Sequence, residues 1–215
     1  MIKGKIVLAI LFFSTISFAQ TTNSSPYSLF GIGEQARLKS VEEIGMGLMG
    51  GALDSEYQLS FTNPASYGSL QWTTYVFSGG NRTNVVNDGE QSQTSSAAAL
   101  SYIALGIPIR GNQGLVMGLQ LNTSVGYGLS DQTFDDEGEL IEVDRYYGNG
   151  GTNRVFLGYG YKFPFDLSLG LEAAYIFGSI DNNVVNRREG VQLATQHRTD
   201  SNVRGSKIKV GAHYA

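Results

Sequence analysis

The sequence predicts an all-β protein: a transmembrane antiparallel β-barrel, of which about six strands are present, with an N-terminal luminal hatch segment. Three observations lead to this fold class. Apolar residues alternate with small or polar ones over stretches longer than the usual 5–6 residues of a globular strand. Short and long connections alternate between these stretches. Charged residues make up 16% of the chain, below the roughly 25% of an average soluble domain.

Composition excludes several functional classes. The 215 residues include no cysteine, which rules out a disulfide scaffold, thiolate zinc sites, a lipoprotein anchor and cysteine nucleophiles. The two histidines, His197 and His213, are too few for a histidine-rich metal site. The balance of 15 basic and 19 acidic residues argues against nucleic acid as a partner. We therefore expect no metal, no cofactor and no enzymatic activity.

The first nineteen residues have the pattern of a cleaved signal peptide. Lys3 and Lys5 precede an unbroken apolar run over residues 6–13, and small residues stand at Ser17 and Ala19, just before Gln20. The apolar run is too short for a membrane-spanning helix, which needs about 20 residues. We expect residues 1–19 to be removed on export and the mature chain to reach the outer membrane of a Gram-negative cell.

Strand-like alternation is clearest over residues 114–130. The apolar series consists of Leu115, Met117, Leu119, Leu121, Thr123, Val125, Tyr127 and Leu129. Similar alternation covers residues 152–163, 167–178 and 206–214, and less cleanly 70–78 and 97–109. A soluble β-sandwich would also alternate. The aromatic ends of the apolar series, and the glycine and charge on the other face, favour a lipid-facing band around a polar lumen.

Connection lengths support the same conclusion. The predicted links are long at residues 79–96, 131–151 and 180–204, and short at 111–113 and 164–166, as in outer-membrane barrels. Six strands are fewer than the eight of the smallest single-chain barrels. We therefore expect residues 68–215 to be an incomplete barrel from a longer protein. Its expected partners are outer-membrane lipid and, during insertion, the barrel-assembly machinery.

Residues 20–67 do not alternate, and we expect them to form a hatch inside the lumen. Asn63 suits a helix N-cap and Pro64 the first helical position. The apolar side chains that such a hatch would bury are Phe30, Leu48, Met49 and Phe61. The expected luminal polar residues are Gln120, Asn122, Glu172, Lys207 and Lys209.

Two motifs resemble the N-terminal hatch of the FadL/OmpP1/TodX outer-membrane transporters: a Gly-Met-Gly run at residues 45–47, and Asn-Pro-Ala at residues 63–65. Residues 104–109, 118–121 and 124–127 further resemble the branch common in Bacteroidetes. The resemblance covers residues 25–127. It implies a plugged barrel that transports hydrophobic compounds, similar to long-chain fatty acids, with the hatch residues contacting the hydrophobic ligand.

Several motifs allow a second interpretation. Residues 45–50 match the dinucleotide pattern G-x-G-x-x-G, but no flanking strand and helix are readable. The acidic residues 135–139 could bind Ca²⁺, although they lack EF-hand spacing and suit a turn. Pro108 is either a kink beside a lateral exit or the end of a strand.

The positive residues near the end of the sequence also allow two interpretations. Lys207, Lys209 and His213 could steer anions, or could pair with luminal carboxylates such as Glu172. His213 has no accompanying G-x-S-x-G motif for nucleophilic catalysis.

Three functions compete on these grounds. Transport of hydrophobic compounds through a plugged barrel comes first. The alternative is a partner-binding barrel in protein secretion or surface assembly. A general porin comes third, because a plug-like N-terminus would obstruct it.

Overall fold

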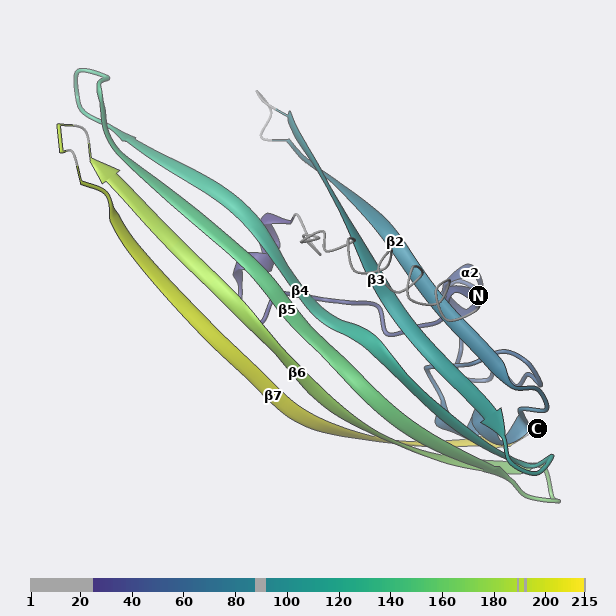
Figure 1. Cartoon of the computed structure of the whole chain (residues 1–215). Coiled ribbons are helices and arrows are strands. Elements are labelled where there is room, and N and C mark those ends of the chain that lie inside the picture. Colours follow the sequence, from purple (N-terminus) through teal and green to yellow (C-terminus); the bar gives the residue numbers. More distant parts are fainter. Residues whose placement is uncertain (1–24, 88–91, 189, 192, 215) are drawn as a thin grey trace, which may run out of the picture.

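The described residues form a seven-stranded antiparallel sheet with an irregular N-terminal segment packed on one face. The computed structural model describes residues 25–87, 92–188, 190–191 and 193–214. The strand order is β2-β3-β4-β5-β6-β7 (Figure 1). Strand β1 pairs separately with β4. The strands are β1 (Glu34–Gln35), β2 (Thr74–Asn87), β3 (Ser92–Pro108), β4 (Gln113–Phe134), β5 (Leu140–Lys162), β6 (Leu167–Arg188) and β7 (Thr195–Tyr214).

The all-β prediction and its six long strands are confirmed, whereas closure into a barrel is not: β2 and β7 are the two edges of the described sheet. The predicted signal peptide, residues 1–19, lies outside the described residues. No helix in the described part of the chain has the length and apolar character needed to cross a membrane.

The predicted long connections were wrong, because the strands extend through most of them. Strands β4 and β5 pair as far as Phe134 and Leu140, and a short turn joins them. Strands β6 and β7 pair as far as Asn186 and Thr195. These distal halves carry polar residues on both faces, so they lack the alternation that identifies a strand. Backbone ladder hydrogen bonds need no apolar face, and the strands continue without one.

A β-bulge overturns the alternation predicted for the second half of β4. The pairing with β5 shifts between Leu121 and Thr123, and an extra residue there reverses which side chains face each side. Leu119 therefore lies on the exposed apolar face, whereas Val125 is buried beside Gly33 of the N-terminal segment. Thr123, which belongs to the predicted apolar series, is buried as well.

Between this bulge and the turn that joins β5 to β6, the two faces of the sheet differ as the alternation predicts. The outer face is apolar and uncovered; its large exposed residues include Met117, Leu119, Val155, Leu157, Tyr159, Leu169, Leu171, Tyr175, Phe177, Ile208 and Val210. The inner face carries small and polar residues and is covered by the N-terminal segment. The buried core lies between the two, and consists of Leu59, Phe61, Tyr67, Leu70, Tyr102, Ala104, Val116, Phe156 and Ala174.

From residue 25 onward the N-terminal segment contains three short helices, each explained by its first residues. The 3-10 helix η1 (Pro26–Leu29) begins with proline, which is preorganised for that position. Helix α2 (Val41–Gly45) begins with a capping box, in which Ser40 and Glu43 satisfy each other's backbone N–H groups. The 3-10 helix η2 (Pro64–Ser69) begins after Asn63, whose side chain accepts a hydrogen bond from Ala65 N–H. The predicted N-cap at Asn63 is confirmed.

Candidate functional site

A row of four glycines on the inner face forms the seat of helix η2. Gly114 pairs with Gly160, Gly160 with Gly170, and Gly170 with Gly211, so the row crosses β4, β5, β6 and β7 in register. A Cβ atom on Gly160 would lie 2.9 Å from the Pro64 carbonyl oxygen. Side chains at these positions would therefore hold the helix away, and we call this row the glycine seat.

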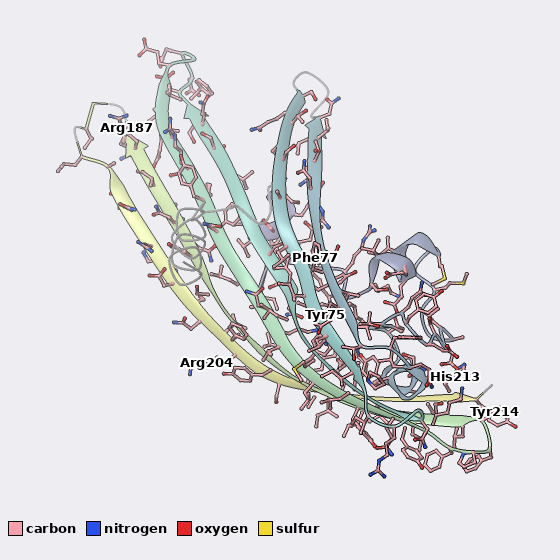
Figure 2. The ribbon with its side chains drawn as sticks, turned by 45° about the vertical axis from the view of Figure 1, so that its right-hand side comes forward. Tyr75, Phe77, Arg187, Arg204, His213 and Tyr214 are labelled. Carbon is pink, nitrogen blue, oxygen red and sulfur yellow. The ribbon has the colours of Figure 1, made fainter. Side chains whose placement is uncertain are left out.

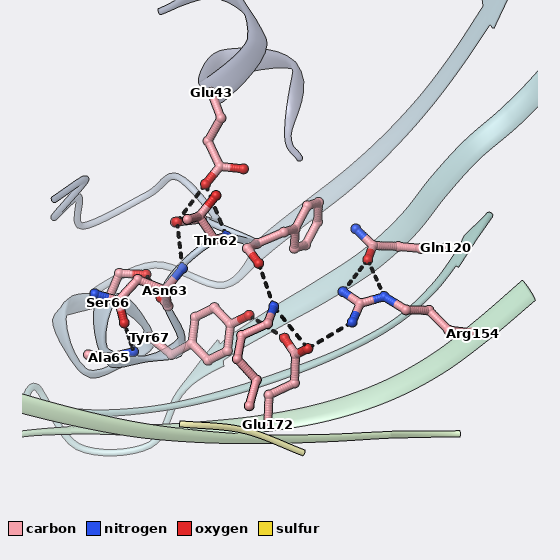
Figure 3. Close-up of polar contacts among 12 residues, drawn as sticks. Glu43, Thr62, Asn63, Ala65, Ser66, Tyr67, Gln120, Arg154 and Glu172 are labelled. Carbon is pink, nitrogen blue, oxygen red and sulfur yellow. Dashed lines mark hydrogen bonds and ion pairs between the residues drawn. The ribbon is translucent and has the colours of Figure 1, made fainter. Parts of the chain in front are cut away.

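The next row of the inner face places charged groups directly beneath the N-terminal segment. Gly158 pairs with Glu172, and Glu172 pairs with Lys209. Lys209 Nζ lies 3.2 Å from Glu172 Oε1 and donates a hydrogen bond of 2.8 Å to the Phe61 carbonyl. The Tyr67 hydroxyl donates to Glu172 Oε2 at 3.0 Å. One carboxylate of the sheet thus binds the N-terminal segment both directly and through Lys209 (Figure 3).

Arg154 completes this buried cluster. Its guanidinium Nη1 lies 2.9 Å from Glu172 Oε1, and its Nε donates to Gln120 Oε1 at 2.8 Å. Its side chain is 0% exposed and that of Glu172 is 1% exposed. The guanidinium also lies 4.9 Å from the centre of the Phe156 ring, within cation–π range. We call Tyr67, Gln120, Arg154, Glu172 and Lys209 the charge cluster.

The charge cluster holds two cations and one carboxylate, so Glu172 is the group on which its electrostatics depend. Removing one partner of a buried pair leaves an uncompensated charge and is strongly destabilising. Burial raises the pKa of the Tyr67 phenol well above its usual value near 10, and the negative charge of Glu172 raises it further. Tyr67 is therefore a neutral hydrogen-bond donor at physiological pH.

A second buried carboxylate organises the N-terminal segment itself. Glu43 accepts hydrogen bonds from Ser40 N–H at 2.7 Å, from the Ser60 hydroxyl at 2.7 Å and from Thr62 N–H at 3.1 Å. It therefore joins helix α2 to the chain that leads into η2. Asn63 then ties this chain to the sheet, because its Nδ2 donates to Gly51 O at 2.9 Å and to Ala212 O at 3.1 Å.

The structure brings three of the five predicted luminal polar residues together. Gln120, Glu172 and Lys209 belong to the charge cluster, whereas Asn122 bonds Thr152 Oγ1 at 2.9 Å and Lys207 is exposed. For Lys209 the pairing with Glu172 agrees with the carboxylate-pairing interpretation. Sequence reasoning missed Arg154 and Tyr67. The sequence did offer a signal for Arg154, because it belongs to the same alternating series of β5 as Gly158 and Gly160.

Of the four apolar residues expected in the hatch, only Phe61 lies in the core. Its ring makes edge contacts with Tyr102 and Phe156, at centroid distances of 4.9 and 5.7 Å. Phe30 and Met49 are 74% and 75% exposed, and Leu48 is 44% exposed. These three are therefore free to contact something other than the sheet.

The motifs with a second interpretation have structural roles. Gly45 ends α2, and residues 46–50 form the turn that follows, with positive φ at Gly47 and Leu48. The two-residue β1 that precedes α2 forms no βαβ unit. Asp135 Oδ1 accepts hydrogen bonds from the N–H groups of Glu137 and Glu139, so the acidic stretch is a turn. Pro108 is the last residue of β3, as its strand-end interpretation predicts. The described residues contain no cluster of three potential metal ligands.

The fold and this interface define a class of protein: an antiparallel β wall with an apolar outer face and an N-terminal segment bound to its inner face. The chain belongs to the BamG family, a barrel-assembly-related family, whose model matches residues 1–215. Comparison with curated proteins and with solved structures found no match to either.

This family membership corrects the resemblance to the FadL/OmpP1/TodX transporters, which was wrong, and with it the expected transport of hydrophobic compounds. The two motifs behind that resemblance have local causes: the glycine run makes a turn and Asn63–Pro64 begins a helix. The alternative, a partner-binding barrel in secretion or surface assembly, agrees better with the family. The family also links the chain to the barrel-assembly machinery and to the outer membrane.

Proposed function

We propose that this protein is a partner-binding component of outer-membrane β-barrel assembly, embedded in the membrane through its sheet and without enzymatic activity. One observation carries the proposal: the outer face of the sheet is apolar and uncovered, whereas the N-terminal segment covers the inner face at backbone contact. Membership of the BamG family supports barrel assembly as the process in which the protein acts.

The outer face suits a membrane wall. Leu157, Leu171 and Val210 are about half exposed or more, and they lie on three neighbouring strands. An aromatic cluster marks one border of this band: Phe163 contacts Tyr161 and Phe165, at ring centroid distances of 4.6 and 5.3 Å, beside the turn between β5 and β6. Aromatic girdles at the edges of an apolar band are typical of outer-membrane barrels. We propose that the described sheet is part of such a barrel, inserted after residues 1–19 are removed.

The N-terminal segment favours partner binding over conduction. Helix η2 touches the glycine seat at backbone contact. Across the same interface, Glu172 accepts a hydrogen bond from the Tyr67 hydroxyl and Lys209 donates one to the Phe61 carbonyl. An interface packed in this way holds a segment in one position. It leaves Phe30 and Met49 exposed, where a partner can contact them.

Co-purification from the native host tests the proposal. The full-length protein, tagged and expressed at its native level, should purify with barrel-assembly components from detergent-solubilised outer membranes. Its depletion should lower the amounts of several unrelated outer-membrane barrels. If the protein purifies without these components, and depletion leaves outer-membrane barrels at normal levels while changing the uptake of one compound, the assembly role is wrong.

A further inference from the structure

Strands β3 and β4 separate in the distal half of the sheet and leave two strand edges facing each other. Their ladder runs only from Pro108–Gly114 to Tyr102–Gln120. Beyond it, β3 continues to Ser92 with β2 as its described strand neighbour, and β4 continues to Phe134 beside β5. Figure 2 shows the β2–β3 hairpin standing apart from β4 at the end of the sheet that carries Arg187.

The separation is open on both faces of the sheet. A hollow of about 560 Å³ is lined by residues that include Leu100, Leu119 and Phe177. A second hollow, of about 210 Å³, is lined by β1 and α2 residues as well as by β2 and β3. Both hollows share Ala99, Ser101, Tyr102 and Leu121. We call this space between the two diverging strands the slot.

Part of the slot already holds an extended segment of the chain itself. Strand β1 pairs antiparallel with β4, with Glu34 opposite Ser124 and Gln35 opposite Thr123. Ala36 N–H donates to Asn122 O at 2.9 Å, and Gly126 N–H donates to the Ser28 hydroxyl at 3.1 Å. The β4 edge from Asn122 to Gly126 is thus covered by the N-terminal segment. The β4 side of the slot is thus already paired with extended backbone from the chain itself.

From this geometry we infer that the slot binds an extended segment of another polypeptide as an added β-strand. The inference rests on the proposed function, and it names the partner's chemistry: a strand with apolar residues on one face and small residues on the other. Leu100 and Leu119 are exposed on the outer face, whereas Ala97 is buried on the inner face, so such a strand would continue both surfaces.

Backbone chemistry favours a polypeptide over a lipid in the slot. Strand edges are templates for pairing with another chain. The backbone N–H and C=O groups along such an edge are matched by an occupant that carries hydrogen-bonding groups of its own. An acyl chain could fill the hollow beside Leu100 but could donate or accept no hydrogen bond. An added strand both donates and accepts main-chain hydrogen bonds, which give affinity, and its alternate side chains give selectivity.

The chain's lack of cysteine makes a disulfide-capture experiment possible. Ala99→Cys and Leu100→Cys place a thiol on the β3 part of the slot. Leu169→Cys places one on the outer face of β6 as a matched control. Each purified full-length variant in detergent micelles is mixed with a ten-residue peptide that alternates leucine with serine and ends in an activated cysteine. A second peptide has the same sequence with N-methyl groups at every second residue, which removes ladder donors without lowering hydrophobicity.

The slot variants should capture the unmethylated peptide about tenfold more than the methylated one, because several ladder hydrogen bonds are lost together. Leu169→Cys should capture both peptides equally and weakly. Equal capture of the two peptides by the slot variants would show adsorption to an apolar surface and overturn the inference. Capture no greater than that of Leu169→Cys would overturn it too. The assay contains no assembly machinery, so co-purification from cells can fail or succeed independently of it.

Discussion

Gly160→Ala should release the N-terminal segment from the sheet without unfolding the sheet. The added Cβ would lie 2.9 Å from both Pro64 O and the Tyr67 carbonyl carbon, and closer still to Gly68 N. Ordinary van der Waals contact begins at 3.4 Å, and all three atoms belong to the backbone of η2 or its flank. No side-chain rotation can relieve the overlap, so η2 must move as a unit away from the glycine seat.

The expected cost is about 1–3 kcal/mol, the range for inserting a methyl group into a well-packed interface. Because about 1.4 kcal/mol is a tenfold change in an equilibrium constant, the unseated population should rise by roughly five- to 150-fold. Gly128→Ala is the matched control. It also lies within a central strand, and its Cβ would make an ordinary contact of 3.7 Å with Tyr147.

Maleimide labelling of a single thiol measures the release. Ala65 lies in η2 and is 0% exposed, so Ala65→Cys in the full-length protein should label slowly. Gly160→Ala should accelerate that labelling by the same factor as the unseated population, whereas Gly128→Ala should not. Met49→Cys, at an exposed position, should label equally in all backgrounds. Unchanged labelling of Ala65→Cys in the Gly160→Ala background would show that η2 does not depend on the glycine seat.

Three further predictions concern the same interface. Glu172→Gln leaves the cations of Arg154 and Lys209 without their carboxylate. The free energy of unfolding, measured with denaturant, should fall by about 3–5 kcal/mol. A decrease below about 1 kcal/mol would contradict the charge cluster as described. The raised pKa of Tyr67 means that the folded state retains the phenolic proton above pH 10, where the unfolded chain loses it. Stability should therefore fall as pH rises above about 10, and Tyr67→Phe should flatten this decline; an identical slope in the variant would refute the assignment. Asn63→Ala removes the N-cap of η2 and the bond to Ala212, and should weaken the seating of η2 by ~0.5–2 kcal/mol. Labelling of Ala65→Cys should then rise while the sheet stays folded. A global loss of protease resistance would instead make Asn63 essential to the whole fold.

Sequence reasoning succeeded where local chemistry decides the structure. Asn63 and Pro64 begin a helix because of their own capping and dihedral preferences. The alternation in residues 152–162 and 167–178 matches the observed faces, because β5 and β6 pair there without a register shift. These features need no knowledge of distant residues.

It failed where pairing across the sheet decides the structure. Nothing local to residues 121–123 announces the bulge that buries Val125, because the extra residue is defined against the partner strand. The polar distal strands resemble loops in composition and are recognised only through their ladders. Arg154 resembles any charged residue on a polar face until η2 is placed above the inner face and Glu172 lies beside it.

The glycines explain why the motifs pointed to the wrong family although the all-β antiparallel sheet was predicted. A segment that packs on the inner face of a β wall needs small residues in that wall, turns within the segment and a cap where it enters its last helix. Gly160, the turn at Gly47 and Asn63 meet these three needs in this chain. Any protein that binds an N-terminal segment in this way meets the same requirements, whether it transports a ligand or recognises a polypeptide. The two functions differ in whether the wall offers strand edges with which another polypeptide can pair. In this chain such edges lie at the slot between β3 and β4.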